Sequence, residues 1–107
     1  MREKKQSEIE AFLKLLESGL FTKEQLNTAS TWFVEYWLDK KAYVSPYKAG
    51  DIVGMHGRYI RQLCRDGAIN CTRMVTGGWW LIPAETLIEL RKRVLERQNE
   101  RRPGGSR

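Results

Sequence analysis

The sequence lacks the long apolar segments that mark membrane and secreted proteins. None of its 107 residues belongs to an apolar run near the ~20 residues needed to cross a bilayer. Residues 1–5 are charged and are not followed by the apolar stretch of a secretory signal peptide. We therefore predict a cytoplasmic protein with no membrane partner.

Side chains that carry catalysis or bind metals are also scarce. The two cysteines, Cys64 and Cys71, are too few for a disulfide framework in a reducing compartment, and their spacing to the single histidine, His56, does not fit a metal site. We expect both thiols to be buried as small apolar groups. Paired carboxylates in an apolar setting and a glycine-rich phosphate loop are missing too. The sequence therefore predicts no enzyme activity, no cofactor, no metal and no small-molecule ligand.

The basic residues, in contrast, are plentiful and unevenly distributed. Residues 1–42 hold seven basic and seven acidic residues, whereas residues 43–107 hold twelve basic and six acidic residues and so carry the net charge of +6. Ten of those twelve are arginines, whose planar guanidinium binds phosphate and guanine through two hydrogen bonds at once. This asymmetry favours a nucleic-acid partner over a membrane surface.

Two helices are predicted in residues 1–42. The first covers residues 7–18, with a Ser-x-x-Glu capping box that begins at Ser7 and a stop at Gly19. Its expected core face follows the helical period and consists of Ile9, Phe12, Leu13 and Leu16. The second helix is predicted to begin at Thr22, with a Thr-x-x-Gln capping box, and to continue to about residue 41.

The second helix has an unusually wide apolar arc. Its members are Leu26, Ala29, Trp32, Phe33, Val34, Tyr36, Trp37 and Leu38. An arc wider than half the circumference indicates a helix covered on two sides. The first helix can cover one side. The other cover is either the rest of the chain, which we favour, or a second copy or another partner.

Residues 45–67 predict two short helices joined by a tight turn. Ser45 followed by Pro46 is a strong helix start, and the helix is expected to cover residues 46–53. Gly54 is expected to adopt a left-handed conformation that lets the next helix leave at a steep angle. That helix is predicted over residues 56–66, with a stop at Gly67.

A β-hairpin and a last helix follow. The strands are predicted over residues 71–75 and 79–82, around a turn at residues 76–78. Alternation places Trp80 and Ile82 on one face of the second strand. The last helix begins at Pro83, with an apolar side formed by Leu87, Ile88, Leu90, Val94 and Leu95. Residues 98–107 have the composition of a basic disordered tail that adds nonspecific attraction to DNA.

The helix over residues 56–66 has two distinct faces. Ile60, Leu63 and Cys64 are expected to point into the core. The opposite face carries Arg58, Arg61, Gln62 and Arg65, at positions i, i+3, i+4 and i+7. Arginine and glutamine side chains recognise guanine and adenine edges in the major groove. We predict that the first three of these residues contact bases and that Arg65 contacts the DNA backbone.

The order of helix, glycine turn, arginine-bearing helix and hairpin is that of a winged helix-turn-helix. Residues 43–95 resemble the excisionase and MerR-type DNA-binding domains of prokaryotes, whereas residues 1–42 resemble no family that we recognise. The residues that carry the resemblance are Ser45-Pro46, Ala49, Gly54, Ile60, Gly67 and Trp80-Leu81-Ile82-Pro83.

The expected fold is therefore mainly α with a small β-hairpin, a winged helix-turn-helix preceded by an N-terminal helical hairpin. The expected division is a packing or oligomerisation segment at 1–42, a DNA-binding domain at 43–97 and a tail at 98–107. The resemblance implies a sequence-specific accessory factor that binds and bends double-stranded DNA, directs an integrase or other recombinase or represses transcription, and self-associates on DNA at the nucleoid.

Several residues depart from the family pattern or extend the predicted interface. His56 and Gly57 stand where the family usually has a Ser or Thr cap. Gly57 is either merely tolerated in the first turn of the helix, where a glycine costs little stability, or it lets the backbone approach DNA closely. Tyr59 either packs or touches a phosphate. Trp79 replaces a basic wing residue and either lies against a sugar or, as we favour, packs on the N-terminal helices. The other predicted DNA contacts are Arg73 on the wing, and Ser45, Tyr47 and Lys48 at the start of the first short helix.

Two further hypotheses remain at this stage. The small subunit of phage terminase, a DNA packaging factor, carries a comparable winged helix, usually at the front of a larger chain. Alternatively, the chain is a protein-interaction module that docks a partner through its N-terminal helices and whose wing no longer binds DNA.

Overall fold

A computed structural model describes residues 5–73 and 78–101. Within these ranges the chain forms five helices and one four-stranded antiparallel sheet, and none of these helices is long and apolar enough to cross a membrane. The elements are α1 (Gln6–Ser18), α2 (Lys23–Trp32), β1 (Val34–Tyr36), β2 (Lys41–Val44), α3 (Pro46–Val53), α4 (Gly57–Arg65), β3 (Thr72–Arg73), β4 (Trp80–Pro83) and α5 (Ala84–Arg101).

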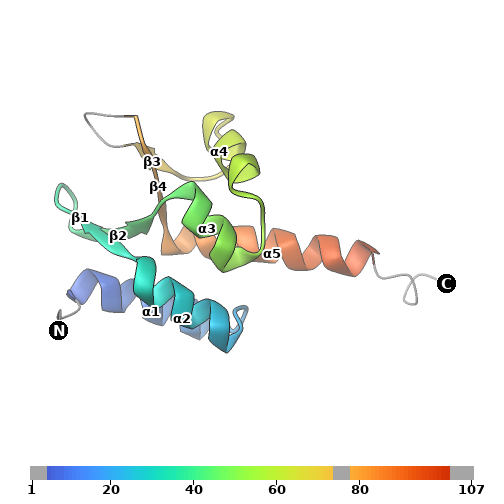
Figure 1. Cartoon of the computed structure of the whole chain (residues 1–107), viewed down its shortest axis with the longest axis horizontal. Coiled ribbons are helices and arrows are strands. Elements are labelled where there is room, and N and C mark those ends of the chain that lie inside the picture. Colours follow the sequence, from blue (N-terminus) through green and yellow to red (C-terminus); the bar gives the residue numbers. More distant parts are fainter. Residues whose placement is uncertain (1–4, 74–77, 102–107) are drawn as a thin grey trace.

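The helices are arranged so that α4 lies far from the N-terminal pair. Figure 1 shows α4 and the β3–β4 hairpin at the top, α3 and α5 in the middle, and α1 and α2 at the bottom. The core lies between these layers, where α5 packs against α1 and α3 and where α3 packs against α4. The N-terminal helices therefore leave α4 uncovered.

The predicted second helix is wrong beyond Trp32. Helix α2 begins with the expected capping box between Thr22 and Gln25 but ends at Trp32, and the chain then continues as β1. The β-branched and aromatic residues after Trp32 have high strand propensity and pair with β2. Because alternate residues of a strand point to opposite faces, the wide apolar arc expected for a helix does not form.

The β1–β2 hairpin connects the N-terminal segment to the predicted wing. Asp39 Oδ1 accepts a hydrogen bond of 3.1 Å from the backbone N–H of Lys41, and its other oxygen accepts one from the Tyr43 hydroxyl. Burial, followed by this contact with Asp39, raises the pKa of Tyr43 to about 12. Strand β2 also pairs with β4, which gives the strand order β1-β2-β4-β3. Residues 1–42 and the wing therefore contribute to one sheet.

The predicted core face of α1 is also wrong. Ile9, Leu13 and Leu16 are 40%, 42% and 48% exposed, whereas the buried side of the helix carries Ala11 and Leu15 together with two polar residues. This side of α1 packs against α5 and β2. Ser7 does not cap the helix, because its hydroxyl donates to Glu35 of β1 over 2.7 Å.

The two short helices form as the sequence predicts. The Ser45 hydroxyl caps α3 by accepting a hydrogen bond from the N–H of Lys48, and Gly54 ends the helix in the left-handed conformation with φ of 86°. Helix α4 ends close to Gly67, whose φ is also positive.

Helix α5 is longer than predicted and joins distant parts of the chain. It begins at Ala84 and continues to Arg101, so residues 98–101 are helical and do not belong to a disordered tail. Leu87 and Leu90 are fully buried, as expected. Arg91 donates hydrogen bonds of 2.9 Å to the carbonyl of Leu20, between α1 and α2, and to the carbonyl of Val53 at the end of α3.

The β3–β4 hairpin is described only in part, because residues 74–77, which include most of the predicted turn, lie outside the described ranges. Thr72 and Arg73 pair with Leu81 and Trp80. Of the two residues predicted to share one face of the second strand, Ile82 is buried and Trp80 is half-buried. The favoured packing of Trp79 on the N-terminal helices is wrong, because this side chain is 67% exposed.

The expectation of two free buried thiols is also wrong. Cys64, in the last turn of α4, forms a disulfide with Cys71, just before β3, and their Cα atoms are 5.8 Å apart. The chain reverses direction after Gly67, which brings the two Cβ atoms within bonding range. The bond ties α4 to the strand that leads into the wing.

Reduction of this disulfide is expected to lower the free energy of unfolding by about 2 kcal/mol, because the short loop between the cysteines regains conformational entropy in the unfolded chain. Urea unfolding with and without a reductant measures the change. The control is a Cys64→Ala/Cys71→Ala variant, whose unfolding midpoint should not respond to the reductant. An unchanged midpoint of the wild-type chain on reduction would contradict this prediction.

Candidate nucleic-acid interface

The two faces of α4 separate as the sequence predicts. Ile60, Leu63 and Cys64 are buried against the core. The opposite face carries four exposed polar side chains, those of Arg58, Arg61, Gln62 and Arg65. A short amphipathic helix held along one side presents its other side to solvent as a ridge, with the dimensions that a major groove admits.

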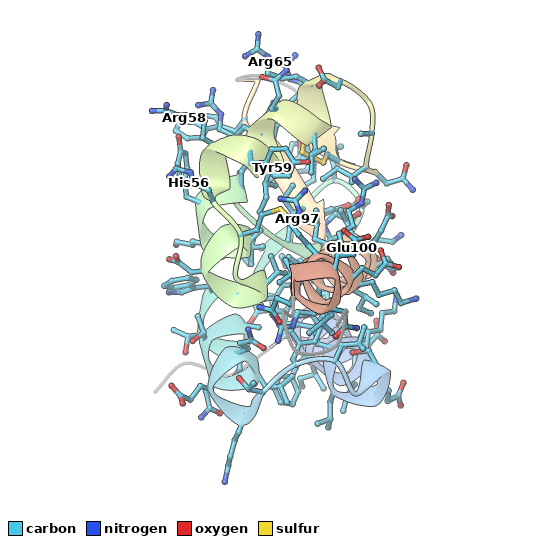
Figure 2. All side chains as sticks on the ribbon, turned by 90° about the vertical axis from the view of Figure 1, so that its right-hand side faces the viewer. His56, Arg58, Tyr59, Arg65, Arg97 and Glu100 are labelled. Atoms are coloured by element: carbon cyan, nitrogen blue, oxygen red, sulfur yellow. A yellow bond between two sulfur atoms is a disulfide. The ribbon has the colours of Figure 1, made fainter. Side chains whose placement is uncertain are left out.

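Arg58 and Arg65 project freely from this ridge. Figure 2 shows both side chains directed away from the body of the molecule, Arg58 to one side and Arg65 at the top. Neither makes a hydrogen bond or ion pair with another residue of the described ranges. Because no internal partner has to be displaced, both guanidinium groups are available to an external anion or base edge.

Arg61 and Gln62 have weak internal contacts. Arg61 Nη1 donates to the Tyr47 hydroxyl of α3 over 3.4 Å, and Gln62 Nε2 donates to Asp66 Oδ1 over 2.9 Å. All of these side chains are exposed, so their hydrogen bonds can be exchanged for contacts to a ligand at small cost. The hydrogen bond from Gln62 also occupies one oxygen of Asp66, the acidic residue that comes directly after Arg65 in the sequence.

The two residues at the start of α4 have different environments. His56 is exposed and caps the helix, because its Nδ1 accepts a 3.2 Å hydrogen bond from the N–H of Arg58. Gly57 is buried against α3, and a Cβ built on it would lie 2.5 Å from Cδ1 and 2.8 Å from Cα of Tyr47. Gly57 thus serves the close packing of two helices, which favours tolerance of glycine in the first turn over the alternative of a close backbone approach to DNA.

The start of α3 adds three of the predicted residues to the same side. The hydroxyl of Ser45 is used as a cap, and Tyr47 is exposed and reaches Arg61. Lys48 is exposed, with its Nζ 5.6 Å from the centre of the Trp32 ring. The first turn of α3 therefore borders the α4 ridge.

Tyr59 is paired with Arg97 of α5, which is not among the predicted DNA contacts. The Arg97 guanidinium lies 5.6 Å from the centre of the Tyr59 ring, and Figure 2 shows the two side chains facing each other. They line a cleft of about 340 Å³ together with His56. The continued helical spacing from Val94 could have indicated Arg97, since the first residue that stops a helix after it is Pro103.

Arg73 has two contacts within the hairpin. Its guanidinium lies 4.8 Å from the centre of the Trp80 ring, and its Nη2 donates to the carbonyl of Gly78 over 3.2 Å. These contacts hold the two strands of the hairpin together. The predicted wing contact of Arg73 with a phosphate stays a prediction, since the guanidinium is exposed and has further N–H donors.

The structure thus brings most of the predicted residues to one side of the molecule. The side chains of α4, His56 and the start of α3 form a continuous polar surface to which Arg97 of α5 is added, whereas Gly57 and Arg73 have packing roles. Comparison with protein-family models, with curated proteins and with solved structures finds no match for this chain.

Proposed function

We propose that this protein is a sequence-specific accessory factor that binds double-stranded DNA and has no catalytic activity of its own. Helix α4 is the recognition helix, and α3 supports it and contacts the phosphate backbone. Arg58, Arg61 and Gln62 contact base edges, and Arg65 and Arg97 contact phosphates.

One observation carries the proposal. The apolar side of α4 is buried, and its whole arginine-bearing side is exposed on the part of the molecule farthest from α1 and α2 (Figure 1). A ridge shielded by the N-terminal helices could not enter a groove. The net charge of +6 in residues 43–107 supports the same proposal, because a basic surface attracts the phosphate backbone.

The finer role rests on the resemblance of residues 43–95. By that resemblance the protein is an excisionase-type factor that bends DNA to direct an integrase, or that represses a promoter, with several copies bound side by side. The position of α4 away from α1 and α2 (Figure 1) is compatible with neighbouring copies on one duplex, because each copy keeps its reading helix accessible.

A duplex selected from a random pool by the purified protein tests the proposal. We expect a preferred sequence and a binding constant whose logarithm falls linearly with the logarithm of salt concentration, by about 0.9 for each phosphate contacted. Binding that prefers no sequence, or that salt does not weaken, would contradict the proposal.

The exposed apolar side chains of α1 favour a second candidate function, that of a protein-interaction module. Ile9, Leu13 and Leu16 lie one helical turn apart on the side opposite the core. Leu13→Asp would abolish partner binding by such a module, and duplex binding would show no sequence preference. If DNA recognition is the function, the same variant leaves DNA affinity unchanged.

A further inference from the structure

The two faces of the sheet differ sharply in their exposure. Ala42, Val44 and Ile82 point to the core and are almost fully buried. On the opposite face Tyr36 and Tyr43 are buried, but Val34 and Trp79 are 58% and 67% exposed, and Trp37, which follows β1, is 72% exposed. Two tryptophans of such exposure on one small sheet are unusual for a surface that contacts only water.

The strand register shows how these side chains are distributed. Val34 lies opposite Tyr43, and Tyr43 lies opposite Pro83 of β4. Leu81 and Trp79 precede Pro83 by two and four residues, so they share its face, because side chains alternate along a strand. Tyr36 lies on the same face as Val34, and Trp37 follows β1, with its ring centre 6.1 Å from that of Tyr36. Trp37 lines a groove together with Val34 and Leu81. Trp37 therefore follows the row of side chains at its β1 end, and Trp79 precedes it at its β4 end.

A groove of about 370 Å³ lies on this face between the apolar side chains. It is lined by Trp32, Val34, Trp37 and Leu81, and at its border by Ser45 and Lys48 of the α3 start. These last two residues also belong to the candidate DNA interface. The groove is therefore continuous with the surface that borders the recognition helix.

The charges of the groove favour an anionic ligand. Lys48 supplies an ammonium group beside the Trp32 ring. Glu35 is the one acidic residue that lines the groove, and its carboxylate points to the other face, where it contacts Ser7 over 2.7 Å and Lys5 over 3.4 Å. Exposed indole rings beside an ammonium group suit a ligand that combines flat rings with phosphates.

We propose that this surface, which we call the aromatic sheet face (Trp32, Val34, Trp37, Lys48, Trp79 and Leu81), binds single-stranded nucleic acid. Unpaired bases stack on Trp37 and Trp79, and Lys48 contacts a phosphate. A duplex cannot bind in this way, because its bases are already stacked on each other inside the helix. The stacking of unpaired bases on Trp37 and Trp79 does not depend on the proposed function. Only the statement that this face adjoins a duplex-binding site rests on that function.

Fluorescence anisotropy with a labelled oligo(dT) of about 15 nucleotides tests this proposal, because that length covers a typical single-strand site. Wild-type protein should bind the oligonucleotide, and Trp37→Ala or Trp79→Ala should each weaken binding by about 5- to 150-fold. Trp37→Phe should stay within about threefold of wild type, because a phenyl ring still stacks. Leu13→Ala, an exposed apolar residue on α1, is the matched control and should bind like wild type. A parallel titration with oligo(U) shows whether the surface prefers DNA or RNA.

Three results would overturn the proposal. The first is that wild-type protein does not bind the oligonucleotide. The second is that the tryptophan variants bind it as well as Leu13→Ala does. The third is that wild-type protein self-associates during sedimentation, that Trp37→Ala does not, and that neither binds the oligonucleotide, which would assign the face to a protein contact. Arg58→Ala should lose affinity for a selected duplex but keep its affinity for oligo(dT), so a failure of the duplex function is recognised separately.

Discussion

Arg58→Ala is expected to weaken binding to a selected duplex by about 1–3 kcal/mol and to relax the preference for one base pair, because a bidentate arginine contact to guanine is worth that much. Arg58 is the strongest candidate for this role. It lies in the first turn of α4, which enters deepest into a groove, and it makes no contact within the described ranges that competes with a base. Gln62→Ala should have the same kind of effect at a different base pair.

The comparison with Arg65→Ala makes this test specific. Arg65 is in the last turn of α4, so its loss should weaken all duplexes alike and reduce the salt slope by about 1. Lys23→Ala removes the same charge from α2 on the far side of the molecule and should change neither property. Quantitative gel shifts with the selected duplex and its single-base variants separate these outcomes. If Arg58→Ala behaves like Lys23→Ala on every duplex, α4 is not the recognition helix.

Gly50→Ala is expected to destabilise the protein by about 3 kcal/mol, at the upper end of the cost of overpacking. A Cβ on Gly50 would lie 2.3 Å from the carbonyl oxygen of Met55 and 3.0 Å from the backbone nitrogen of Gly57. Both are backbone atoms of the turn and of α4, so no flexible side chain can move to make room. Helix α4 has to shift away from α3, and the affinity for DNA should fall together with the stability.

Gly19→Ala is the matched control for this substitution. Gly19 has a positive φ of 71°, but a Cβ there would meet nothing within 4 Å. Its replacement should therefore cost only about 1–2 kcal/mol of backbone strain. Urea unfolding followed by circular dichroism compares the two variants. A smaller loss for Gly50→Ala than for Gly19→Ala would show that α3 and α4 do not pack as closely as described.

Local signals were sufficient for the part of the fold that carries the candidate site. The Ser45-Pro46 start, the turn at Gly54 and the two faces of α4 all follow from neighbouring residues, and the structure has them as predicted. Capping, a left-handed glycine and helical periodicity act over a few residues, so a sequence displays them directly. The exposed positions of Arg58, Arg61, Gln62 and Arg65 follow from the same periodicity.

The errors arose where a distant segment decides between two local possibilities. Residues 33–41 contain enough apolar side chains for a helix, but pairing of β2 with β4 favours strands, and β4 is about 40 residues further along the chain. Helix α1 has one side with Ile9, Leu13 and Leu16 and another with Ala11, Leu15 and two polar residues, and only the packing of α1 against α5 and β2 decides which one is buried. The pairing of Tyr59 with Arg97 depends in the same way on how α5 crosses α4.

The sequence by itself therefore determined α4, the turn before it and the basic character of residues 43–107, because these depend on the spacing of adjacent residues and on their charge. Only the tertiary structure decided that one sheet joins both halves of the chain, that Cys64 bonds to Cys71, and that Trp37 and Trp79 face solvent. Each of these depends on contacts between segments that are separate in sequence. Such contacts are selected by the free energy of the whole packed chain, which no local pattern contains.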